Sequence, residues 1–166
     1  MKSQFISLLL LLFVITSCKK ETPAEKTSSY PAIIVGTHKN GVYTVENQDI
    51  VKQEWEKQLR AAGITSEIGS FKIDVLKIEG DGQTVGSTSY LGLTAVTKDG
   101  KSSLCALLDP QDGGRYYFNQ DTPAIICSGT CQHGCNPSGL LKNGNFFLVC
   151  SECSDCVKTE FILNFP

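Results

Sequence analysis

The strongest constraint on how this chain folds is the crowding of cysteines in its C-terminal part. Six of the eight cysteines fall within the last 47 of the 166 residues, where they make up about 13% of the sequence. They form two triplets with regular spacing, namely Cys127, Cys131 and Cys135, followed by Cys150, Cys153 and Cys156. In an exported chain, such a density of cysteines indicates a disulfide scaffold.

The sequence between the triplets favours their approach. Asn143-Gly144 lies between them, and both residue types accept the positive φ of a tight hairpin turn. A hairpin folded there brings the triplets face to face, and the Cα separation across a strand ladder suits a disulfide. We therefore expect bridges between the triplets, with the pairing left open. Residues 121–135 contain little apolar surface, so we expect them to depend on these crosslinks rather than on core burial.

The same cysteines offer an alternative, a metal centre. Cysteine thiolates at these spacings can hold zinc, although only Cys150–Cys153 and Cys153–Cys156 have the knuckle spacing of structural zinc sites. The run from Cys150 to Cys156 also resembles the start of the bacterial ferredoxin motif for an iron–sulfur cluster, but Glu160 and Phe161 replace its last Cys and Pro. The full set of alternative ligands is Cys127, Cys131, His133, Cys135, Cys150, Cys153 and Cys156.

A thiol-redox pair is a further alternative. Cys150-Ser-Glu-Cys153 has the spacing of such pairs, but no helical sequence follows it to lower the pKa of the first thiol. Acidic neighbours such as Glu152 and Asp155 act in the opposite direction and raise a thiol pKa. Cys105 stands apart in an apolar run, and we expect it to be a small buried core residue.

The N-terminal eighteen residues carry a second signal. A single charge at Lys2 precedes an apolar run from Phe5 to Ile15, which ends in small residues. This order is typical of a secretory signal peptide. The run is shorter than the roughly 20 apolar residues that a membrane-spanning helix needs.

Ile15-Thr16-Ser17-Cys18 resembles the lipobox of bacterial lipoproteins, with Ile and Ser at positions where Leu and Gly or Ala are commoner. The resemblance covers the N-terminus alone. It implies cleavage before Cys18, attachment of diacylglycerol to its sulfur and acylation of its new amine, with chains such as palmitate. Several acyl chains anchor a protein firmly. By the sorting rule of enteric lipoproteins, Lys19 favours the outer membrane, on either its periplasmic or its surface side.

Composition divides the chain into four parts. Residues 1–17 form the signal peptide, and the polar residues 18–31 form a lipidated tether, because they cannot bury enough apolar surface to fold. We assign 32–119 to an α+β core and 120–166 to a cysteine-rich hairpin extension of the same domain. Without the signal peptide the chain has 14 basic and 17 acidic residues, which gives no basic surface for nucleic acid.

Patterns within the core predict one helix among strands. Asn40-Gly41 between two β-branched runs predicts a hairpin. Over 48–62, apolar residues recur at Val51, Trp55, Leu59 and Ala62, as on one face of a helix. The remaining apolar runs read as strands over 71–75, 90–97, 103–108, 115–118, 140–141, 146–149 and 159–163. We expect an α+β fold with an antiparallel sheet packed on one helix, an order of elements also found in cystatin-like rolls.

Motifs for catalysis are lacking. The chain has no Gly-x-Ser-x-Gly elbow and no phosphate-binding loop, and its two histidines are His38 and His133. We therefore lean against an enzyme and expect a non-enzymatic binding module without a cofactor, anchored in the cell envelope by lipid. Its partner is an envelope protein or a glycan. The loose resemblance to cysteine-rich lipoproteins of unassigned function adds no mechanism. A zinc or iron–sulfur lipoprotein and a small thiol-redox protein are the alternatives.

Overall fold

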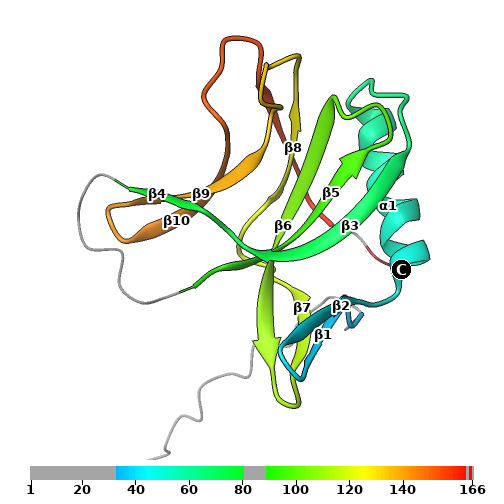
Figure 1. Ribbon diagram of the computed structural model, residues 1–166, viewed down its shortest axis with the longest axis vertical. Helices are drawn as coiled ribbons and strands as arrows, with labels where there is room; N and C mark the ends of the chain where they lie inside the picture. Colours follow the sequence, from blue (N-terminus) through cyan, green and yellow to red (C-terminus); the bar gives the residue numbers. More distant parts are fainter. Residues whose placement is uncertain (1–32, 81–88, 164, 166) are drawn as a thin grey trace, which may run out of the picture.

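The computed structural model describes residues 33–80, 89–163 and 165 (Figure 1). The expected signal peptide, Cys18 and the tether lie outside these residues, as does Ala32, the first residue assigned to the α+β core. The described part contains one helix and eleven strands, and the strands form two sheets. The elements are β1 Gly36–Lys39, β2 Val42–Val45, α1 Gln48–Ala61, β3 Ile68–Val75, β4 Ile78–Gly80, β5 Leu91–Thr97, β6 Ser102–Gln111, β7 Arg115–Phe118, β8 Ala124–Ser128, β9 Pro137–Lys142, β10 Asn145–Cys150 and β11 Val157–Phe161.

The larger sheet is organised around the long strand β6. One edge of β6 pairs with β5, which in turn pairs with β3. Its other edge is shared, because the first half pairs with β8 and the second half with β7. Strand β11 lies outside β8, and the β1–β2 hairpin lies outside β7. Since β2 also lies against β3, the sheet curls toward a barrel (Figure 1).

The smaller sheet has the order β10-β9-β4 and lies beside the larger one (Figure 1). Its β9–β10 hairpin turns at Asn143 and Gly144, with φ of 52° and 75°. The β1–β2 hairpin turns at Asn40 and Gly41, with φ of 53° and 79°. Both turns were predicted from the Asn-Gly pairs, which tolerate positive φ at both central positions.

The predicted helix is confirmed, with α1 ending one residue before the expected end. Its apolar face is fully buried through Val51, Trp55 and Leu59. Asn47 stands at the cap position, but its side chain makes no capping bond and donates instead to the carbonyl of Ile34 at 2.8 Å. Gly63, with φ of 77°, ends the helix in the left-handed conformation that glycine adopts most easily.

The buried side chains fall into two groups on opposite faces of β6. The helix-side core gathers around Trp55 and takes Leu104, Ala106 and Leu108 from β6. The cystine-side core lies against the smaller sheet and consists of Leu76, Cys105, Leu107, Ile125, Cys127, Cys135 and Leu148. Because both faces are covered, the first seven residues of β6 are all buried, without the alternation of a half-exposed strand.

Two expectations need correction. Residues 124–127 are buried and form most of β8, so the expectation that 121–135 lacks core burial was wrong. The run Ala-Ile-Ile-Cys is short, but it lies between both cores. The fold class is also only partly as expected, since antiparallel strands dominate. The single described helix covers one face of the larger sheet, while the smaller sheet lies against the other.

Candidate functional site at the stapled loops

Three disulfides join the two cysteine triplets in sequence order. Cys127 bonds Cys150, Cys131 bonds Cys153 and Cys135 bonds Cys156, with Cα separations of 5.6, 6.2 and 5.5 Å. These separations lie within the ordinary range for disulfides. The prediction of bridges between the triplets is confirmed, and the structure supplies the pairing that the sequence left open.

The route to this pairing differs from the one expected. In the β9–β10 ladder Cys150 faces Pro137 rather than another cysteine. The Cys127–Cys150 bridge joins β8 to the end of β10. The other two bridges hold together two loops, 129–136 after β8 and 151–156 before β11, which we call the stapled loops. Their bases are adjacent because β8 pairs with β11, with Val157 opposite Ser128. A Cβ on Gly129 would overlap the backbone of Asp155, so the two loops meet backbone to backbone.

The cysteines of the three bridges differ in burial. Cys127 is completely buried in the cystine-side core, and its partner Cys150 packs against that core. Cys135 is also buried, but Cys156 is half-buried, as are both Cys131 and Cys153. Cys150 is half-buried as well, so each of the Cys127–Cys150 and Cys135–Cys156 bridges has one buried cysteine, and the Cys131–Cys153 bridge, with none, is the one most accessible to solvent.

Each stapled loop contains a tight turn that begins at a cysteine. In the first loop the amide of Gly134 donates to the carbonyl of Cys131 at 3.0 Å, and in the second the amide of Cys156 donates to the carbonyl of Cys153 at 3.1 Å. The loops are also joined by backbone polar contacts, since the amide of Ser151 donates to the carbonyl of Asn136 at 2.8 Å. The stapled loops are thus ordered by hydrogen bonds as well as by sulfur.

The geometry also places the residues of the alternative metal centre. The sulfur atoms of Cys131, Cys135 and Cys156 all lie within 4.8 Å of one another. All three take part in disulfides, and a disulfide sulfur is not the thiolate that zinc or an iron–sulfur cluster binds. His133 is exposed at the tip of the first turn. This ligand set therefore fits a metal only after reduction of the bridges.

The structure also shows the state of the expected redox pair, Cys150 and Cys153, and of the remaining cysteine, Cys105. Cys150 and Cys153 belong to different bridges, so they do not form a Cys-x-x-Cys disulfide. Cys105 is a free thiol that is completely buried in the cystine-side core, as expected. Burial raises the pKa of the Cys105 thiol to about 12, because the core cannot solvate a thiolate.

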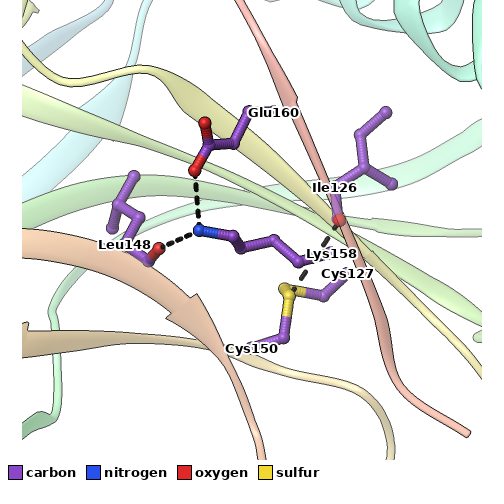
Figure 2. A network of polar contacts seen from close by, with 6 residues as sticks. All are labelled: Ile126, Cys127, Leu148, Cys150, Lys158 and Glu160. Carbon is purple, nitrogen blue, oxygen red and sulfur yellow. Dashed lines mark hydrogen bonds and ion pairs between the residues drawn. A yellow bond between two sulfur atoms is a disulfide. The ribbon is translucent and has the colours of Figure 1, made fainter.

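The edge of β10 that lies toward β11 borders a hollow of about 120 Å³, whose lining contains no residue of the stapled loops. Figure 2 shows how Lys158 of β11 reaches this edge, donating to the carbonyl of Leu148 at 3.2 Å and to Glu160 Oε1 at 2.7 Å. The figure also marks Cys150 Sγ against the carbonyl of Ile126 at 4.0 Å, which is a packing contact because a disulfide sulfur has no proton. The hollow is lined by Asp121, Thr122, Pro123, Phe146, Phe147, Leu148 and Glu160.

Exposed apolar side chains occur on the same two strands and just after them. Phe147 on β10 is 47% exposed, Val157 on β11 is 60% exposed and Ile162 is 64% exposed. Sequence reasoning placed Phe147 in a strand but did not select it as a functional residue. The only sequence signal was the unbroken apolar run 146–149, which does not say which side chain faces solvent.

No protein-family model, no curated protein and no solved structure matches this chain. Among the described residues, no helix is both long enough and apolar enough to span a bilayer.

Proposed function

We propose that this protein is an envelope lipoprotein, held at the outer membrane by lipid on Cys18, which works as a non-enzymatic binding module. The observation that carries the proposal is the set of three disulfides between the triplets. Disulfides persist in oxidising compartments and are rare where thiols are kept reduced. They support export, and the sequence Ile15-Thr16-Ser17-Cys18 supplies the signal for export with lipid attachment.

The hollow beside β10 supports a protein partner over a small molecule. Pockets for small ligands usually enclose roughly 300–1,000 Å³, whereas this one measures about 120 Å³. That volume suits one or two side chains of a partner. The floor is apolar at Phe146 and Leu148, and carboxylates of Asp121 and Glu160 line it. Because the Glu160 carboxylate already accepts from Lys158 at 2.7 Å, an apolar side chain fits this lining best.

The disulfides keep this surface fixed before a partner arrives. Strand β10 ends at Cys150, which is bonded to Cys127 inside β8. Lys158 ties β11 to the carbonyl of Leu148 on the same strand. A surface that is already ordered loses less conformational entropy on binding, so affinity does not have to offset that cost.

Lipid anchoring is tested with the full chain in a bacterial host with lipoprotein processing. Wild-type protein is expected in the membrane fraction with labelled acyl chains, whereas Cys18→Ala is expected without label and either soluble or uncleaved. Cys105→Ala serves as the matched control, because it removes a cysteine that is buried in the fold. Normal acylation and anchoring of Cys18→Ala would rule out the lipoprotein assignment.

The same strain tests the surface with a photo-crosslinking residue at position 147 or, as a control, at position 42. Phe147 and Val42 are both exposed, at 47% and 63%, but Val42 lies on the distant β1–β2 hairpin (Figure 1). We expect a discrete adduct with one envelope protein from position 147, which disappears when Thr122→Trp is added to fill the hollow. Equal adducts from both positions, or none from 147, would count against the binding surface.

A further inference from the structure

We propose that the Cys131–Cys153 and Cys135–Cys156 bridges form a thiol-triggered switch, which exchanges two bridges between the loops for one bridge within each loop. The products would be Cys131–Cys135 and Cys153–Cys156. The inference rests on the geometry of the stapled loops and does not depend on the proposed binding function or on lipid attachment.

The positions of the sulfur atoms favour this exchange. Cys131 Sγ lies within 4.8 Å of both sulfurs of the neighbouring Cys135–Cys156 bridge. A thiolate released at Cys131 would therefore have a disulfide next to it, with little movement needed for attack. Neither Cys131 nor Cys153 is fully buried, so a small thiol can reach their bridge from solvent.

The turn in the second loop favours formation of the Cys153–Cys156 bridge. Cys153 and Cys156 are the first and last residues of a hydrogen-bonded turn, closed by the 3.1 Å contact from the amide of Cys156 to the carbonyl of Cys153. The ends of such a turn have Cα atoms closer than about 7 Å, and a disulfide needs about 4.4–6.8 Å. The backbone of the second loop is thus already close to the geometry of a Cys153–Cys156 bridge.

The exchange consists of three displacements and is neutral in electrons. The thiolate of a small external thiol attacks Cys153 Sγ, which forms a mixed disulfide and releases the Cys131 thiolate. The Cys131 thiolate attacks Cys135 Sγ, which forms Cys131–Cys135 and releases the Cys156 thiolate. The Cys156 thiolate then attacks Cys153 Sγ of the mixed disulfide, which forms Cys153–Cys156 and returns the external thiolate. The small thiol is needed only in catalytic amount.

The third bridge and the free thiol stay outside the exchange. Cys127 is completely buried and Cys150 is half-buried, so the Cys127–Cys150 bridge is less open to a thiol in solution than the Cys131–Cys153 bridge, in which both cysteines are half-buried. Cys105 is buried as well, and burial raises its pKa to about 12, so it supplies almost no thiolate near neutral pH. After the exchange, β8 and β10 remain linked by sulfur, but the tips of the stapled loops are free to separate.

The test treats the purified full chain in detergent with substoichiometric cysteamine, blocks thiols in acid, and digests without reductant. A Glu-specific protease cuts after Glu152 and trypsin cuts after Lys158, which together yield the hexapeptide 153–158. With bridges between the loops, this hexapeptide stays attached to the tryptic peptide 116–142. After the exchange it is released alone and carries an internal disulfide, which lowers its mass by two hydrogens relative to the reduced form.

We expect the oxidised hexapeptide only in thiol-treated samples, equally in wild type and in Cys105→Ala, while peptides 116–142 and 143–152 stay joined through Cys127–Cys150. A hexapeptide released with two free thiols would show reduction instead of exchange and would overturn the proposal. So would a stable mixed disulfide at Cys153 with no released hexapeptide. Loss of release in Cys105→Ala would also overturn it, because the buried thiol would then be the nucleophile.

Discussion

Cys105 illustrates how one environment determines the chemistry of a thiol. Its sulfur faces the side of the sheet that carries the disulfides, and a Cβ added to Gly92 would lie 3.0 Å from it. Packing this close leaves no room for water to solvate a thiolate. Burial therefore raises the pKa of Cys105 from 9.0 to about 12. The residue behaves as a small apolar side chain, even though disulfides lie nearby.

We predict that Cys105 resists alkylation in the folded protein. At pH 8 a thiol with a pKa of about 12 is ionised in roughly one molecule in ten thousand, against roughly one in ten for an unburied thiol. Because burial raises the pKa, the labelling rate should stay low through pH 9 and rise only toward pH 12. Iodoacetamide labelling with peptide mapping, in native buffer and in denaturant, measures this. Equal labelling in both conditions would show that the thiol is accessible.

At the scale of elements, the junction of the stapled loops depends on the absence of a side chain. A Cβ at Gly129 would overlap the carbonyl oxygen of Asp155 and would lie 3.1 Å from Cys156 Cα. These are backbone atoms, fixed by the β8–β11 ladder on one side and by the Cys135–Cys156 bridge on the other. Neither neighbour can move away without breaking pairing or bending the bridge.

We predict that Gly129→Ala lowers the free energy of unfolding by about 1–3 kcal/mol, the usual cost of overpacking. Gly69→Ala is the matched control, since its Cβ would meet backbone atoms of Lys98 at 3.4 Å, an ordinary contact. Urea unfolding followed by the fluorescence of Trp55, the single tryptophan, measures both. Equal stability of the two variants would mean that the loops are farther apart than the structure has them.

Local signals in the sequence predicted some elements and could not predict others. The hairpins at Asn40-Gly41 and Asn143-Gly144 follow from backbone preferences of adjacent residues, and α1 follows from its periodicity. Strand β8 was missed because its burial comes from two separate cores rather than from its own pattern. The parallel pairing of β4 with β9 and the order of the disulfides depend on contacts between distant segments, which no local pattern encodes.

For the whole molecule, the disulfides contact only one of the two cores. They lie in or next to the cystine-side core, whereas Trp55 and the helix pack on the opposite face of the sheet. Each bridge closes a loop of 21–23 residues. A single loop of that size contributes about 3 kcal/mol by restricting the unfolded chain. The three contributions do not add, because the first bridge already brings the other cysteines together.

We predict that full reduction with dithiothreitol lowers the melting temperature by roughly 10 °C, which corresponds to about 3 kcal/mol for a domain of this size. Below the new melting temperature the emission of Trp55 should stay that of a buried indole, since its surroundings contain no disulfide. Fluorescence melting of reduced and oxidised protein measures both effects. An immediate red shift of the Trp55 emission on reduction at 25 °C would show that the helix-side core unfolds without the disulfides.

The pairing of β1 with β7 has a consequence for how the chain reaches its structure. Gly36 pairs with Tyr116, 80 positions later, and Ile78 of β4 pairs with Gly139, 61 positions later. A high mean sequence separation between contacting residues slows folding, because distant segments must meet before any contact stabilises them. The β1–β2 hairpin can form locally, but the pairs of β1 with β7 and of β4 with β9 form only after their later partners are available. Late pairing would suit the export that we propose, because a translocation channel passes a chain that has not yet folded.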